Sequence, residues 1–156
     1  ELIPNPDKKT GICLFQFTWP IIGANEEDFD QLHKSIRETT HYCIVKSETP
    51  MDHIFGDTLI KLGKKVKFGV SCASECDMII KGDYVAQVFF PDELKDEIKR
   101  VYEKVKGVEE LDLQYFFKKV VDKKTSIKVI IIRSQELADN LRKIAEKSFN
   151  HSTKSE

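Results

Sequence analysis

The chain has 156 residues, the usual size of one domain, and it is long enough to bury a core without disulfides or metal ions. Hydrophobic residues make up 40% of the chain and charged residues 33%, which excludes a disordered protein. The 25 basic residues nearly balance the 26 acidic ones. Because nucleic-acid-binding modules normally carry a basic excess, we expect no direct nucleic-acid contact.

Apolar runs and cysteines indicate the compartment. No run approaches the 20 or so apolar residues that a membrane span needs, so we expect no membrane contact. Cys13 and Cys43 lie inside apolar runs, which is typical of small core residues in a reducing compartment. These features predict a cytoplasmic protein. The first residue is Glu1 rather than Met, and we expect the chain to be a piece of a longer protein.

The sequence predicts one domain between two polar ends. Residues 1–10 contain two prolines and a charged turn, which predict a linker. Residues 150–156 are polar and predict a flexible tail. Residues 11–149 carry the periodic apolar pattern and predict a single α/β domain.

The first half of the domain alternates strands and helices. Strands are predicted over 11–19, 41–46 and 66–71. The helix between the first two begins at Asn25, and the next has Pro50 in its first turn and ends at Gly63. This order predicts parallel strands joined by right-handed crossovers.

The second half departs from that order. Runs over 77–81 and 84–90 flank Gly82-Asp83 and predict a hairpin. Residues 127–132 form an apolar run that predicts a central strand. Three helices are predicted around these strands, over 91–106, over 109–122 and from Ser134 onward. The expected fold is a three-layer α/β/α domain with a mostly parallel sheet and an antiparallel hairpin around Gly82-Asp83.

Polar residues follow several predicted strands. In open α/β sheets, ligands bind in the crevice beyond the carboxyl ends of the strands. Exposed N–H groups at helix starts there favour anions, although ordinary helix capping explains the same serines and threonines. The candidate ligand-binding residues, for a small polar or anionic effector, are Trp19, Ser47, Glu48, Thr49, Cys72, Arg133 and Ser134.

Catalytic patterns are weak. Cys72 and Cys76 form a C-x3-C pair that could serve redox sensing, and Cys72 with a histidine is an alternative, cysteine-dependent enzyme. Asp52, His53 and Asp57 share one predicted helix and could ligate a metal, but His53 and Asp57, four residues apart, are more typical of an exposed ion pair. The chain has no glycine-rich phosphate loop, nucleophile elbow or zinc-protease motif. We therefore expect no metal and no cofactor, and enzymatic function is not favoured.

The adjacent Phe116 and Phe117 indicate a second type of function. One of them should lie near the helix surface, and such a hydrophobic face would suit a homodimer or a partner domain. A non-catalytic dimerisation or interaction domain is therefore a further alternative.

The order of parts over residues 25–149 resembles a known family. The helix from Asp28 to Thr40, the run 41–48 and the segment from Gly63 to Val70 resemble the phospholipase-D-like effector domain of archaeal transcriptional regulators. Residues 76–86 resemble the part where true phospholipases keep a His-x-Lys motif, but this chain has Met78-Ile79-Ile80-Lys81. The resemblance implies that enzyme chemistry is lost and that a sensing role remains.

These observations lead to one hypothesis. We expect a small-molecule-sensing regulatory domain of a larger intracellular protein, with the effector domain of a transcriptional regulator as the specific case. Ligand binding would favour one domain or dimer arrangement through its differential affinity for the two.

Overall fold

The computed structural model describes residues 10–19, 27, 30, 34, 39–71, 75–122 and 124–151. The predicted linker, apart from Thr10, lies outside these ranges, as do Cys72 and the predicted helix start at Asn25. Residues 27, 30 and 34 are helical. None of the described helices is long and apolar enough to cross a membrane.

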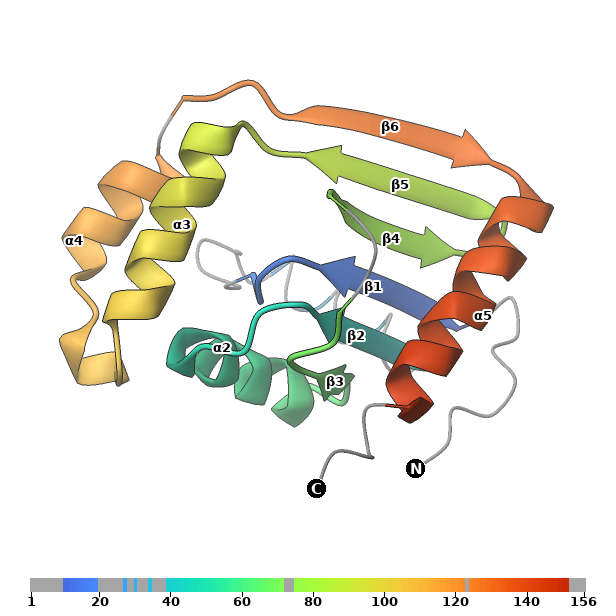
Figure 1. The fold of residues 1–156 in the computed structure, drawn as a ribbon, viewed down its shortest axis with the longest axis horizontal. Helices are drawn as coiled ribbons and strands as arrows, with labels where there is room; N and C mark the ends of the chain where they lie inside the picture. Colours follow the sequence, from blue (N-terminus) through green and yellow to red (C-terminus); the bar gives the residue numbers. More distant parts are fainter. Residues whose placement is uncertain are drawn as a thin grey trace.

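A six-stranded mixed sheet forms the centre of the molecule (Figure 1). Its order is β3-β2-β1-β4-β5-β6. The strands are β1 (Gly11–Phe15), β2 (His41–Val45), β3 (Lys65–Lys67), β4 (Asp77–Lys81), β5 (Tyr84–Phe89) and β6 (Lys128–Arg133). The α/β class is confirmed.

The expectation of a mostly parallel sheet is wrong. Only the β1–β2 and β2–β3 pairs are parallel, whereas the β1–β4, β4–β5 and β5–β6 pairs are antiparallel. Three reversals separate β1 from β6, so these two strands run in opposite directions. The apolar run predicted as a central strand is β6, and it lies at the edge of the sheet.

The predicted hairpin is confirmed. β4 and β5 pair from Lys81 opposite Tyr84 back to Asp77 opposite Val88. Gly82 has a φ of 56°, a left-handed conformation that glycine adopts without steric cost at the first position of a two-residue turn. The local sequence therefore predicts the turn between β4 and β5, whereas the parallel pattern already ends at the antiparallel β1–β4 pair.

Helices cover both faces of the sheet. α2 (Pro50–Lys61) packs on one face, where its Leu59 joins Cys13 and Cys43. α5 (Gln135–His151) packs across the other, where its Ala138 contributes to a core with the alternate residues of the strands, such as Ile12 (Figure 1). Successive strand residues point to opposite faces, which explains why neighbours in β1 belong to different clusters.

A third core lies beyond one end of the sheet. It joins α2 to α3 (Asp92–Lys104) and to the segment that follows α3. The single helix predicted over 109–122 is three short pieces: η1 (Val108–Glu110), α4 (Leu113–Phe116) and the π-helical η2 (Phe117–Val121). Phe116 is fully buried in this core and Phe117 is half-buried, so Phe116 cannot contact a partner in the folded chain.

Candidate functional site

The strongest candidate is a cluster of buried polar groups where β1 ends. The sequence predicts a strand through Trp19, but β1 stops at Phe15. The reason is Asp77, the first residue of the neighbouring β4. Its Oδ1 accepts the N–H of Gln16 across 2.8 Å, and its Oδ2 accepts the indole N–H of Trp19. A side chain thus takes the place of the strand ladder at this point.

Burial makes the carboxyl of Asp77 a weaker acid than that of an exposed aspartate. The residue is 2% exposed, and burial raises the pKa of its carboxyl to about 6. The hydrogen bonds from Gln16 and Trp19 act in the opposite direction, because they favour the charged form. The carboxyl therefore changes charge close to physiological pH while it is bonded to the only tryptophan in the chain.

Thr18 is held from both sides. Its N–H donates to Asp52 Oδ1 across 2.7 Å, and its carbonyl oxygen accepts the Tyr102 hydroxyl across 2.7 Å. The residue is completely buried, yet its Oγ1 has no hydrogen-bond partner in the part of the chain that the structure describes. An unsatisfied buried hydroxyl costs about 1–3 kcal/mol, so this position favours an additional polar partner.

Asp52 links this cluster to the start of α2. Thr49 and Asp52 form a capping box, in which each side chain accepts the other's backbone N–H. The Thr49 hydroxyl also donates to Asp52 Oδ2 across 2.7 Å. Asp52 is fully buried and forms no ion pair with a described basic residue, and the same holds for Asp77.

Together these bonds form a frame that joins four elements. The end of β1 is bonded to α2 through Asp52, to α3 through Tyr102 and to β4 through Asp77. Trp19 also packs on Phe90, with ring centroids 4.6 Å apart. The frame gathers an indole, a hydroxyl and two buried carboxylates at one end of the sheet.

The structure separates the predicted ligand-binding residues. Ser47 follows β2 beside this end, since its N–H donates to the Gln16 carbonyl across 3.0 Å. Glu48 is exposed and lies 3.6 Å from the His53 ring nitrogen, so His53 has Glu48 as its acidic neighbour. Thr49 serves as the helix cap. Cys72 lies outside the described residues.

Arg133 and Ser134 do not join this group. They end β6, which runs opposite to β1, so they lie at the other end of the sheet. Arg133 stacks over the Tyr84 ring at 5.7 Å, and the Ser134 hydroxyl accepts the Leu137 N–H across 3.2 Å at the start of α5. The expectation that all the candidate residues share one crevice is therefore wrong.

The described cysteines do not have the properties of a nucleophile. Cys13, Cys43 and Cys76 are free and buried. Burial raises the pKa of the Cys13 and Cys43 thiols, which keeps them protonated at neutral pH. The described residues also contain no group of three or more side chains that could hold a metal ion.

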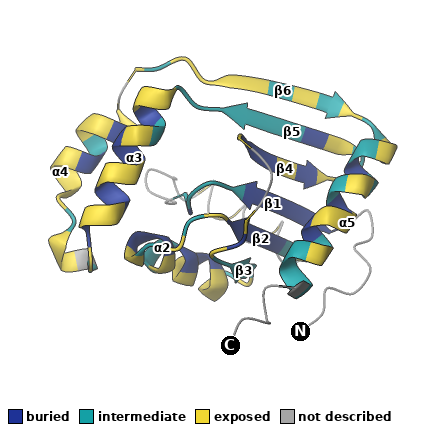
Figure 2. Cartoon of the chain, in the orientation of Figure 1, coloured by how far each residue is buried: buried dark blue, intermediate teal, exposed yellow. Residues whose placement is uncertain are grey.

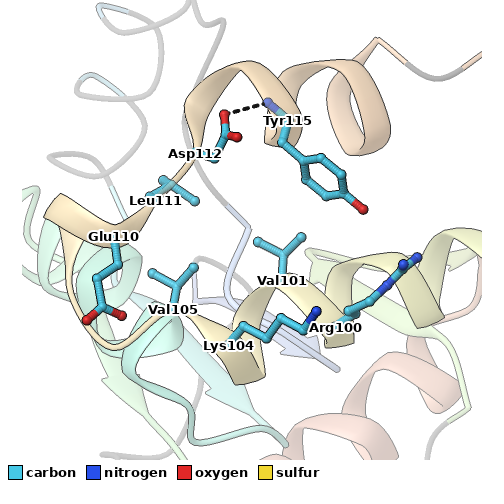
Figure 3. A pocket seen from close by; sticks show the side chains of 8 residues that line it. All are labelled: Arg100, Val101, Lys104, Val105, Glu110, Leu111, Asp112 and Tyr115. Carbon is cyan, nitrogen blue, oxygen red and sulfur yellow. Dashed lines mark hydrogen bonds between the residues drawn. The ribbon is translucent and has the colours of Figure 1, made fainter.

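A groove between α3 and the η1–α4 segment is another candidate site (Figure 3). It has a volume of about 290 Å³, and its lining residues are Arg100, Val101, Lys104, Val105, Glu110, Leu111, Asp112 and Tyr115. Most of its charged groups are already used within the protein. Arg100 pairs with Glu97, Glu110 accepts the Lys106 N–H, and Asp112 accepts the Tyr115 N–H. The groove is therefore a weaker candidate than the end of β1.

Sequence reasoning identified only part of the cluster. It named Trp19 and Thr49 as ligand-binding residues, but that set did not include Thr18, Asp52, Asp77 or Tyr102. The T-x-x-D spacing from Thr49 to Asp52 was an available signal of a capping box. No comparable local signal connects Tyr102 to Thr18, because 84 residues separate the two partners.

No family model, curated protein or solved structure matches this chain.

Proposed function

We propose that the chain is a non-catalytic, ligand-sensing regulatory domain that binds a small polar molecule at the end of β1. The observation that carries this proposal is the buried Thr18 Oγ1, which lacks a partner among the described residues. Asp52 and Tyr102 hold the backbone of Thr18, which places its side chain at this end of the sheet. A ligand that hydrogen-bonds to this hydroxyl would remove a cost that the folded chain otherwise bears.

The charges of the cluster narrow the ligand class. Asp52 and Asp77 are buried without a described basic partner, so the end of β1 has negative potential when they are ionised. Arg133, the basic residue expected to attract an anion, lies at the other end of the sheet. A neutral polyhydroxy compound or a small amine therefore fits this end better than an anionic effector.

The connections of the cluster support sensing over catalysis. Both carboxylates accept hydrogen bonds from the protein's own groups, and neither forms an ion pair with a basic side chain that the structure describes. The same bonds connect the site to α2 and α3. A ligand that shifts Trp19 or Thr18 would change how these helices sit against the sheet, and it would favour whichever arrangement binds it more tightly. The resemblance to effector domains of transcriptional regulators agrees with this role.

Trp19 provides the test, because it is the only tryptophan in the chain. Its emission would be followed while sugars, polyols, small amines and organic acids are added, with thermal unfolding as the second readout. We expect at least one sugar, polyol or amine to change the emission and raise the melting temperature. Absence of any response across these three classes would contradict the proposal.

A matched pair of variants locates the site. Thr18→Val keeps the shape of the side chain and removes the hydroxyl, and we expect about 10-fold weaker binding of the compound found. Thr58→Val removes an exposed hydroxyl on α2 and serves as the control. Equal affinity of Thr18→Val and the wild-type chain would mean that the ligand binds elsewhere.

A further inference from the structure

The two edges of the sheet are built differently. β3 has only three residues, two of them lysines, and Lys67 donates to the Phe149 carbonyl at the end of α5. Short, lysine-bearing edges are a common device against unwanted strand pairing. β6, at the opposite edge, has six residues with the sequence KVIIIR, and its charges lie only at its two ends. In the described part of the chain, β6 pairs with β5 alone.

β6 also exposes large apolar side chains. Val129 is 53% exposed and Ile131 is 68% exposed, while Ile127 just before the strand is 48% exposed. Figure 2 shows the exposed positions along this edge strand. Val129 and Ile131 lie opposite Val88 and Ala86, on the face that carries Ile79 of β4. A run of this kind is typical of strands that are covered on all sides, whereas the described part of the chain leaves Val129 and Ile131 of β6 exposed.

We propose that two copies of this chain pair through their β6 strands, in antiparallel fashion about a two-fold axis, to form one continuous twelve-stranded sheet. The outward backbone groups of each β6 would then hydrogen-bond to the partner strand. The central Val-Ile-Ile-Ile side chains of the two copies would lie beside one another across the new strand pair. This surface replaces Phe116 and Phe117 as the dimer contact, and it does not depend on the ligand site.

The charge pattern of β6 is compatible with self-pairing. Directly opposite residues of an antiparallel pair share a face, and a two-fold axis perpendicular to the sheet keeps each face on its own side. Residues with numbers of different parity therefore never lie opposite each other. Lys128 and Arg133 differ in parity, so a symmetric pair centred on Ile130 or Ile131 places neither cation opposite the other. Both registers set apolar residues against apolar residues at the centre.

The size of the contact sets the expected affinity. Stable interfaces usually bury about 800 Å² on each partner, and single strand pairings with their flanking side chains lie at or below that size. We therefore expect dissociation constants on the order of micromolar. At about 100 μM, the chain should have a mass near twice its 18.0 kDa, and dilution should return it to 18.0 kDa.

Light scattering on the full chain and three variants tests the pairing. Ile131→Lys places a charge near the centre of β6 and should yield only the monomer at about 100 μM. Ile144→Lys is the matched control, since Ile144 on α5 is 53% exposed and away from the edge, and it should remain a dimer. Ile79→Lys changes the same face two strands inward, and it should also remain a dimer.

Several results would contradict the pairing through β6. A wild-type monomer at about 100 μM would overturn the proposal, and so would a dimer that survives Ile131→Lys. If Ile79→Lys dissociates the dimer as completely as Ile131→Lys, the copies meet through their sheet faces and the edge pairing is wrong. Hydrogen exchange of the wild-type chain tests the pairing without relying on a variant that could misfold. The outward amides of residues 129–132 should exchange more slowly at high than at low concentration, and unchanged rates would overturn the pairing.

Discussion

The end of β1 and the β6 edge differ in what they bury, since the first buries polar groups and the second exposes apolar ones. At the end of β1, the polar groups of Thr18, Asp52 and Asp77 lie inside the protein. At β6, Val129 and Ile131 lie outside it. Buried polar groups are usually satisfied by hydrogen bonds, and large apolar groups on a monomer rarely gather at one edge. The first region is therefore suited to a small polar ligand, and the second is suited to a protein partner.

The largest expected effect comes from removing Asp52. Asp52→Ala takes away the acceptor of the Thr18 N–H and breaks the capping box with Thr49. Buried donors left without partners cost about 1–3 kcal/mol each, and loss of a cap adds about 1 kcal/mol. We expect the free energy of unfolding to fall by about 3–4 kcal/mol in urea titrations.

Asp57→Ala is the control for that variant. Asp57 lies on the same helix, but it is exposed. Its removal should change the free energy of unfolding by less than about 0.5 kcal/mol. Similar losses from both variants would show that the acidity of α2, and not the buried frame, stabilises the end of β1.

Asp77 should give the end of β1 an unusual pH dependence. The folded-state pKa of its carboxyl is raised from 3.8 to about 6, so the folded chain binds this proton more tightly than the unfolded chain does. The contribution of this proton to stability is fully present below 3.8 and is lost as the pH rises through about 6. Between about pH 4 and about pH 7, the loss should be on the order of 3 kcal/mol.

Two measurements isolate the Asp77 effect from other titrating groups. The pH dependence of the free energy of unfolding should be weaker in Asp77→Asn than in the wild-type chain over this interval. The emission of Trp19, whose indole N–H is bonded to Asp77, should titrate with a midpoint near 6 in the wild-type chain alone. A midpoint near 3.8 would show that burial does not shift this carboxyl.

Tyr102→Phe should have an intermediate effect. The substitution removes the hydroxyl that donates to the buried Thr18 carbonyl, and it keeps the ring against Phe17 and Phe55. We expect a loss of about 1–2 kcal/mol in the free energy of unfolding. Tyr115→Phe, which removes a part-buried bond from the exposed Tyr115 of α4 to Glu97 on α3, should cost less than Tyr102→Phe. An equal loss from both would contradict a special role for Thr18.

Local patterns predicted the elements of this fold better than their arrangement. The capping residues of α2 and the turn at Gly82-Asp83 lie within a few positions of the structure they determine. The direction and place of β6 depend on three successive antiparallel pairings, β1–β4, β4–β5 and β5–β6. The sequence of residues 127–132 contains no local signal of these pairings. The error placed Arg133 in the wrong crevice. The polar frame escaped prediction because its bonds span 34 to 84 residues.

The smallest effect should come from β6, and it sharpens the contrast with the interior. Ile131→Thr keeps a β-branched side chain at a position that is already 68% exposed, so it removes few contacts. At about 0.05 μM, well below the micromolar dissociation constant expected for the β6 pairing, the chain should be monomeric, and we expect the free energy of unfolding to change by less than about 0.5 kcal/mol. Ile80→Thr, on the fully buried side of β4, should cost more than about 2 kcal/mol. If urea titrations gave Ile131→Thr a loss as large as that of Ile80→Thr, then β6 would be covered within the single chain, and the case for a partner at this edge would fail.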